Sequence, residues 1–166
     1  MPAGSTYTPI ATTTLGSAAA SYTFSSISGS YTDLILVMSA SHSGTGVSDF
    51  IQVGNGSADT GSNYSYTGIA GSGSAASSGR STSQTKGYLG YLATTTIYDA
   101  IIHLQNYSNT TTNKTMLVRK GQADGYVEAN VILWRSTSAI NTIKVFPDAG
   151  NFQAGSTFTL YGIAAA

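Results

Sequence analysis

Two histidines and seven acidic residues are the side chains of this sequence that could carry metal or acid–base chemistry. In the run IIHLQ, a strand would place Ile101, His103 and Gln105 on one face, so His103 could bind a metal. No second histidine or carboxylate has a spacing that would complete such a site. We therefore predict a structural, hydrogen-bonded His103 and no metal-binding residues.

The acidic residues are well separated along the chain. The sequence therefore lacks the paired-carboxylate signature of a glycoside hydrolase, although folding could still bring two acids together. The many serines include no GxSxG nucleophile elbow. The run GSGSAASSG lacks the Lys-Ser/Thr ending of a phosphate-binding loop. We predict that the protein is not an enzyme and that it has neither catalytic residues nor a cofactor.

The loop NGSADTGSN has three side chains whose oxygens could bind Ca²⁺, namely Asn55, Asp59 and Asn63. It lacks the terminal bidentate glutamate of a calcium loop and contains only one acid. Asn and Asp side chains also hydrogen-bond to their own backbone in turns. We therefore favour a network of Asx turns over a calcium site.

Eleven tyrosines are the one compositional excess that could bear function. An exposed aromatic ring beside polar amides suits a sugar-binding groove, and it equally suits a protein interface. Tyrosine is also common at half-buried strand positions, which is the structural alternative. The only tryptophan lies in a run with apolar residues on both strand faces, so it is either central or covered by a partner. The candidate interface residues are Tyr7, Pro9, Ile10, Tyr64, Tyr66, Trp134, Tyr161 and Ile163.

The segments that must position these side chains have the patterns of short strands. Apolar residues recur at period two within residues 22–24, 127–134 and 156–163, which predicts half-buried strands. The runs 31–40 and 97–104 are almost continuously apolar, which is typical of central strands covered on both faces. Clusters of Gly, Ser, Asn and Asp separate the runs, and no convincing amphipathic helix is present. The pattern predicts an all-β fold, an antiparallel two-sheet sandwich that is jelly-roll-like.

The chain divides into an extended N-terminal arm over residues 1–20 and a single β-sandwich domain over residues 21–166. Pro2 and Pro9 favour an extended arm because proline limits helix formation. Residues 54–84 have little apolar content, which predicts a long loop excursion that reaches a neighbouring molecule. The uncharged arm and the C-terminal tail are candidates for contacts with neighbouring copies, and the alternative is that the tail completes a sheet within the chain while the arm frays.

The composition argues against several classes of partner. Charged residues make up 8% of the chain, with seven basic and seven acidic residues, whereas about 25% is usual. Nucleic-acid binding needs clustered basic residues, and here they are mostly scattered. No apolar run approaches the length of a membrane span, and the N-terminal residues lack the pattern of a secretory signal. We expect no nucleic-acid partner, no membrane partner and synthesis in a cytoplasm.

Three parts of the sequence together resemble a family of tailed-phage virion structural proteins, particularly those of aquatic phages such as cyanophages. These parts are STYTPIATTTLGSAAASYTFSSI with YTDLILVM, then DTGSNYSYTGIAGSGSAASSGRSTSQT, then LWRSTSAINTIKVF with GNFQAGSTFTLYGI. The similarity covers almost the whole chain. It implies a virion component that is made in the cytoplasm of the host bacterium.

The resemblance implies one of two positions in the virion. Members are assigned as head decoration (cement) proteins or as tail-fibre proteins, and both are β-rich and commonly trimeric. The sequence shows no collagen-like, coiled-coil or repeated-strand shaft, which favours decoration. We therefore expect a homotrimer on the capsid surface that bridges copies of the major capsid protein. The alternative is a tail-fibre or receptor-binding component that contacts a host surface glycan.

Overall fold

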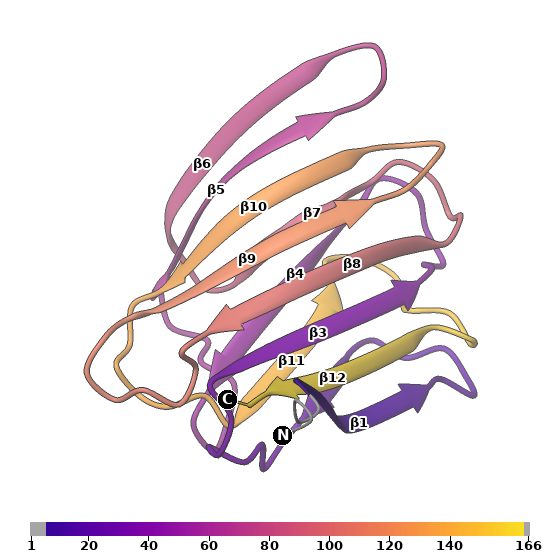
Figure 1. The fold of residues 1–166 in the computed structure, drawn as a ribbon. Coiled ribbons are helices and arrows are strands. Elements are labelled where there is room, and N and C mark those ends of the chain that lie inside the picture. The colour runs from indigo at the N-terminus through magenta and orange to yellow at the C-terminus, as the bar shows by residue number, and fades with distance from the viewer. Residues whose placement is uncertain (1–5, 165–166) are drawn as a thin grey trace.

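Twelve strands make up the regular structure of residues 6–164, which are the residues described in the computed structural model (Figure 1). The strands are β1 (Tyr7–Thr14), β2 (Tyr22–Phe24), β3 (Asp33–Ala40), β4 (Val47–Gly54), β5 (Tyr64–Gly71), β6 (Ala76–Gln84), β7 (Gly87–Leu92), β8 (Tyr98–Gln105), β9 (Lys114–Gly121), β10 (Val127–Trp134), β11 (Thr142–Pro147) and β12 (Thr157–Ile163). Within these residues the structure contains no helix, and so none that could cross a membrane.

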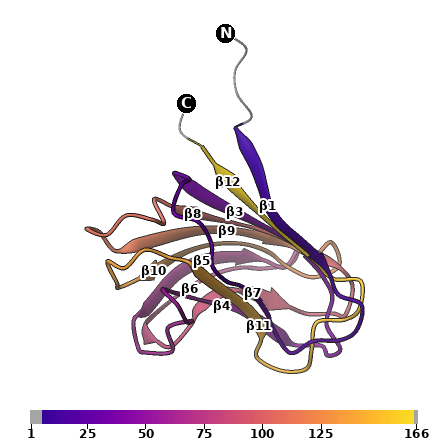
Figure 2. The same cartoon turned by 90° about the horizontal axis from the view of Figure 1, so that it is seen from below.

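The strands form two antiparallel sheets packed face to face. The large sheet has the order β1-β12-β3-β8-β9-β10-β5-β6, and the small sheet has the order β2-β11-β4-β7. Figure 2 shows the two layers from below, with β8 and β9 in one layer and β4 and β11 in the other. The predicted all-β, two-sheet, jelly-roll-like sandwich is confirmed.

The core lies between the two sheets. Strand residues alternate between the two faces of a sheet, so the inward positions of both sheets supply the buried apolar side chains. Leu36 and Ile102 of the large sheet and Ile51 and Val145 of the small sheet are fully buried. This alternation leaves one face of the large sheet in contact with the core and the other turned away from it.

The prediction of a separate N-terminal arm is wrong for residues 6–20, the part of it that the structure describes. Strand β1 is extended, but it pairs with β12 from Tyr7↔Ile163 to Thr14↔Thr157, with a bulge after Pro9. Figure 1 shows both strands at one end of the large sheet. Pairing within the chain satisfies the backbone groups that a free arm would leave to water. The tail therefore completes an intramolecular sheet, and residues 1–5 and 165–166 lie outside the described residues.

The predicted loop excursion over residues 54–84 is also wrong in its second half. Residues 64–84 form the antiparallel hairpin of β5 and β6, which ends the large sheet opposite β1 (Figure 1). Strand β6 is exposed along most of its length and is mostly polar, with the sequence ASSGRSTSQ. An edge strand with two solvated faces has no hydrophobic period, so its sequence resembles that of a loop.

The prediction that the strand of residues 97–104 is covered on both faces is wrong for a single chain. Strand β8 alternates strictly, with Ala100 and Ile102 buried and Ile101 exposed. Strand β10 repeats this arrangement, because Ile132 is buried while Val131 is exposed. The small sheet covers only one face of the large sheet. The apolar residues on the other face are therefore left in solvent.

Candidate functional site

The outward side of the large sheet forms the first candidate surface, which we call the open face. It carries large aliphatic side chains that remain exposed, namely Ile69, Ile101, Leu117, Val127 and Val131. Val127 keeps 67% of its surface in solvent and Ile69 keeps 64%. Figure 1 looks onto this face, with β4 and β11 behind the sheet.

Strand register joins these side chains into one patch. Val131 of β10 pairs with Leu117 of β9, and Ala129 of β10 pairs with Ile69 of β5. Directly paired residues of antiparallel strands have neighbouring side chains on the same face. Two adjoining depressions of about 880 and 580 Å³ hollow the surface, and both are lined by Ile69 and Ile101. The open face is thus a continuous, shallow apolar surface.

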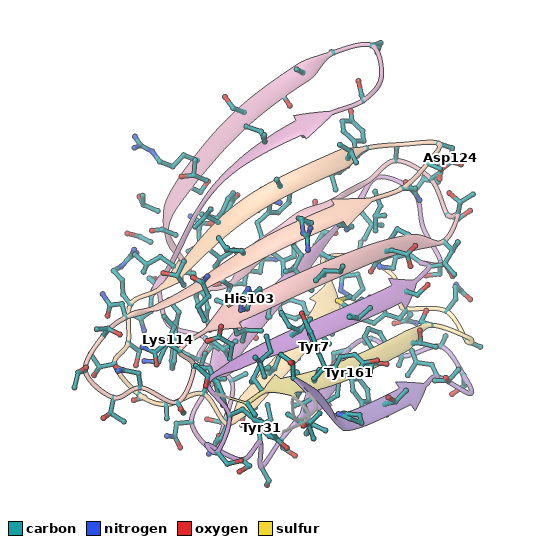
Figure 3. All side chains as sticks on the ribbon, in the orientation of Figure 1. Tyr7, Tyr31, His103, Lys114, Asp124 and Tyr161 are labelled. Atoms are coloured by element: carbon teal, nitrogen blue, oxygen red, sulfur yellow. The ribbon has the colours of Figure 1, made fainter. Side chains whose placement is uncertain are left out.

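Few charged groups interrupt the open face. Asp99 and Arg119 line the larger depression together with the buried Lys120 and Glu128, and His103 lines the smaller one. The His103 Nε2 atom lies 2.8 Å from Asp33 Oδ2, and the backbone N–H of Asn106 donates to Asp33 Oδ1 at 2.7 Å. The prediction of a hydrogen-bonded His103 is confirmed. Figure 3 shows His103 on β8, with Tyr7 and Tyr161 toward the β1 and β12 end.

Several predicted interface residues lie toward this end of the large sheet. Tyr7, 54% exposed, and Ile163 line the smaller depression of the open face, and the rings of Tyr7 and Tyr161 meet edge to face at 6.3 Å. Pro9 is exposed on the edge strand β1. Ile10 is half-buried and packs against the core. The structure thus brings together Tyr7, Tyr161 and Ile163, and it separates Ile10 from them.

The prediction that Tyr64 and Trp134 are interface residues is wrong, because both belong to the core. The Tyr64 hydroxyl donates to the carbonyl oxygens of Val53 and Asp59 at 3.0 and 3.1 Å, and burial raises the Tyr64 pKa. Trp134 Nε1 donates to Asp59 Oδ2 at 2.7 Å. The small sheet and the 55–63 loop cover both rings, so no partner is needed to bury them.

Asp59 organises the loop that the sequence suggested as a possible calcium site. Its Oδ1 accepts from the Gly61 N–H at 2.8 Å, and its Oδ2 accepts from Asn63 Nδ2 at 2.8 Å and from Trp134. Partial burial acts to raise the Asp59 pKa, but the hydrogen bonds from Trp134, Asn63 and Gly61 outweigh it and lower the pKa. The predicted Asx-turn network is confirmed. Residues 6–164 contain no cluster of three metal-ligating side chains.

A second surface, which we call the tyrosine groove, lies where the β5–β6 hairpin extends past β7, the edge of the small sheet. It has a volume of about 570 Å³. Four tyrosines form its aromatic walls: Tyr66 of β5, Tyr88 and Tyr91 of β7, and Tyr126 of the β9–β10 turn. Of these four, only Tyr66 is among the interface residues predicted from the sequence. The tyrosine excess was the available signal, but the four residues are up to 60 positions apart.

A bulge in β7 aims two of the tyrosines into the groove. Asp49 pairs with Gly90 and the next residue, Phe50, pairs with Tyr88, so Leu89 is an extra residue in β7. Because of this insertion, Tyr88 and Tyr91 are both half-buried at the groove. Gly90 has a φ of +142°, which disfavours any residue with a side chain. A Cβ atom there would lie 2.7 Å from Lys120 Cδ.

Buried polar side chains form the floor of the groove. Glu128 is 7% exposed, and its Oε1 accepts from the Tyr91 N–H at 2.7 Å. Asn130 Nδ2 donates to the Leu89 carbonyl oxygen at 3.3 Å. Gly68 permits this arrangement, since a Cβ atom there would overlap the Asn130 amide oxygen. Burial, followed by the charge of Glu128, raises the pKa of Tyr88, so this hydroxyl stays protonated.

A buried ion pair lies directly beneath this floor. Lys120 Nζ is 2.6 Å from Asp49 Oδ2 and donates to the Gly90 carbonyl oxygen at 3.1 Å, while His42 Nε2 is 2.9 Å from Asp49 Oδ1. Burial acts to raise the Asp49 pKa, but the His42 hydrogen bond and the Lys120 charge hold it below its ordinary value. Burial lowers the pKa of Lys120. The pair fixes β4, β7 and β9 to one another.

Glu128 is the one carboxylate among the residues that line the tyrosine groove. Glycoside hydrolysis by the usual mechanism needs two carboxyl groups flanking the scissile bond. The aromatic rings, the buried acid and the buried amide can instead hold a ligand that has both apolar faces and hydroxyl groups. The groove therefore has the chemistry of a binding site.

No protein-family model matches this sequence, and no curated protein matches it. Among solved structures, the chain is similar to CG-16, a homodimeric agglutinin from chicken liver, with 12% identity over 83% of this chain and 98% of the other, at a TM-score of 0.37. It is similar to the Caenorhabditis elegans galectin LEC-6, with 8% identity over 93% and 96% of the two chains and a TM-score of 0.40. It is also similar to Xenopus laevis galectin-Ib, with 10% identity over 85% of this chain and 99% of the other, at a TM-score of 0.39. These similarities concern the fold alone.

Proposed function

We propose that this protein is a non-enzymatic structural protein of a phage virion that decorates the capsid and cements it. In this role it is a homotrimer on the capsid surface and bridges subunits of the major capsid protein. The resemblance of its sequence to tailed-phage virion proteins supports the setting. The observation that carries the role is the open face, an apolar surface that residues 6–164 leave exposed.

The open face supports a contact with other subunits because such surfaces are unfavourable in water. Soluble monomers rarely expose contiguous apolar patches larger than a few hundred Å², and larger ones mark interaction sites. Full burial of one aliphatic side chain contributes about 1.5–3 kcal/mol. Contacts that exist only in the assembled particle add their free energy to that of the assembled state. A shell that covers the open face is therefore stabilised by it.

The low charge of the chain supports the same role. The open face carries Asp99 and Arg119 beside its aliphatic residues, so covering it buries few ions. Unpaired charges are costly to bury, and contacts without them lose little strength as salt rises. A cement protein has to remain bound in dilute and in salty surroundings, which this composition suits.

Localisation of the protein in the intact particle tests the proposal. Cryo-electron microscopy of purified phage should show copies distributed over the head, with the open face against capsid subunits or a second copy. Gold-labelled antibody provides an independent readout on the same particles. Copies confined to the tail would overturn the cementing role.

A tail-fibre or receptor-binding component is the second candidate function, and the tyrosine groove favours it. Four tyrosines beside a buried acid and a buried amide are suited to contact with a host surface glycan. This candidate requires the protein to be at the tail. The localisation experiment therefore separates the two candidates.

A further inference from the structure

We infer that the tyrosine groove is a binding site for a neutral oligosaccharide. This inference goes beyond the cementing role and does not rest on it, because the tyrosine rings of the groove and the aliphatic side chains of the open face are different groups, and the two surfaces adjoin at Ile69. Tyr66 points into the groove, and its neighbours in the strand, Ser65 and Thr67, point the other way.

The aromatic rings of the groove form two pairs. Tyr66 and Tyr88 stack at 5.1 Å between ring centroids with an interplanar angle of 28°, and Tyr91 and Tyr126 meet edge to face at 5.3 Å. All four side chains are half-buried, so each presents part of its ring to the groove. A pyranose ring has C–H faces that pack on such rings, while its hydroxyl groups stay at the edge. A tyrosine offers both an apolar body and a polar tip to such a ligand.

The polar groups of the groove suit hydroxyl donors. Glu128 Oε1 accepts from the Tyr91 N–H, Asn130 Nδ2 lies 3.5 Å from Glu128 Oε2, and the Tyr88 hydroxyl is a further partner of this carboxylate. A carboxylate can accept about four hydrogen bonds, so Glu128 retains capacity for a further donor. On the opposite wall, Ser77 and Ser81 supply hydroxyls that both donate and accept. A ligand with several adjacent hydroxyls satisfies both walls.

The charge of the groove selects against acidic sugars. Glu128 is its one anionic residue and is buried, so its charge is only weakly screened by water. Arg80 is the one cation among the lining residues, and it is exposed on the edge strand β6, where water solvates it. The carboxylate of a uronic acid would be repelled by Glu128. A neutral sugar avoids this cost.

Aromatic side chains continue past the groove onto the outer side of the small sheet. Tyr88 lies 5.8 Å from Phe50, and Phe50 lies 6.1 Å from Phe146, measured between ring centroids. Together with Tyr66 these rings form a row across β5, β7, β4 and β11. The Lys86 ammonium lies 3.6 Å from the centroid of Phe50 and caps that ring. Because Lys86 covers Phe50, the Tyr66–Tyr88 pair and the Tyr91–Tyr126 pair are the aromatic surfaces left for the sugar units of an oligosaccharide.

Titration of the full-length protein with defined trisaccharides tests the inference. The neutral probes are cellotriose, maltotriose and chitotriose, the acidic probe is trigalacturonic acid, and binding is followed by NMR chemical-shift changes and calorimetry. We expect at least one neutral probe to bind at least tenfold more tightly than the acidic probe. The shifts should concentrate on residues 66–91 and 126–130.

Two variants locate the binding. Tyr91→Ala removes a ring from the groove, and Ser77→Trp fills it from the exposed strand β6 without touching the core. Each should weaken the neutral probe at least tenfold. Tyr161→Ala is the matched control, because it removes a half-buried tyrosine from β12, far from the β5–β6 end of the large sheet, and should change affinity less than twofold. Thermal melting followed by circular dichroism checks that each variant is folded.

Three results would overturn the inference. They are no binding of any neutral probe at about 10 mM, equal binding of trigalacturonic acid, or binding that survives both groove variants. If Tyr91→Ala does not fold, Ser77→Trp decides alone. None of these results depends on where the protein lies in the particle, so failure here is distinguishable from failure of the cementing role.

Discussion

The open face and the tyrosine groove adjoin at β5 but present different chemistry. The open face is aliphatic, with Ile69 and Val131 exposed and few hydrogen-bonding groups between them. The groove is aromatic and polar, with Tyr66 above a floor of Glu128 and Asn130. An aliphatic surface gains free energy from any dry, complementary cover, whereas an aromatic and polar groove selects a ligand by its hydroxyl groups.

The two surfaces also differ in what lies beneath them. The groove rests on charged and amide side chains that are buried and hydrogen-bonded, including Asp49 and Lys120. The open face rests on the apolar core beneath Ile101 and Leu117, whereas Lys120 and Glu128 lie beneath its Val127 end. A buried polar network is sensitive to the loss of one member, whereas exposed aliphatic residues tolerate change. Substitutions should therefore affect folding near the groove and association at the open face.

The largest effect is expected from Lys120→Met. This change leaves the buried Asp49 carboxylate without its ammonium partner, so it should lower the free energy of unfolding by about 3–5 kcal/mol. The next residue toward the N-terminus, Arg119, faces outward on the same strand, so Arg119→Met is a matched control with an expected change below about 0.5 kcal/mol. Urea denaturation measures both, and equal losses would show that the network does not support the groove.

The second-largest effect, again on the free energy of unfolding, is expected from Gly90→Ala. A Cβ atom at a φ of +142° is strained and would meet Lys120, so we expect a loss of about 1–3 kcal/mol. Gly79→Ala on the exposed strand β6 is the control, because its backbone is not left-handed and nothing lies near the added atom. Gly79→Ala should be neutral or slightly stabilising. Thermal unfolding compares them, and a stable Gly90→Ala protein would contradict the role of the bulge.

The third effect concerns assembly and should leave folding intact. Val131→Lys places a charge in the middle of the open face, where the side chain is 46% exposed. The free energy of unfolding should change by less than about 0.5 kcal/mol, while retention on phage heads should fall at least tenfold. Binding of purified protein to heads that lack it measures retention. Unchanged retention would exclude the open face as the contact surface.

The smallest effect is expected from salt. Covering the open face buries few charges, so occupancy on phage heads should change less than about twofold between 0.05 and 0.5 M NaCl. Sedimentation of particles with quantification of the bound protein measures this occupancy. A steep loss of occupancy with salt would indicate that charged residues, and not the aliphatic patch, carry the contact.

Strands with one buried face were predictable from the sequence. The alternation of β10 and β12 reports which side chains meet the core, and glycine- and serine-rich clusters mark the turns. The structural roles of His103 and Asp59 were also predictable, because neither has the neighbours that a metal site needs. Strand β6 escaped prediction, because both of its faces are solvated and only its pairing with β5 makes it a strand.

The sequence by itself determined the all-β class and the shortage of charge, since both follow from residue types and local periodicity. Only the tertiary structure decided that Tyr64 is buried while Tyr66 reaches a groove, because this depends on what packs over each ring. It likewise brought Tyr126 to Tyr91 through strand pairing and the bulge at Gly90. Contacts between segments distant in sequence have no local signature, so the position of a binding surface emerges only when the sheets pack.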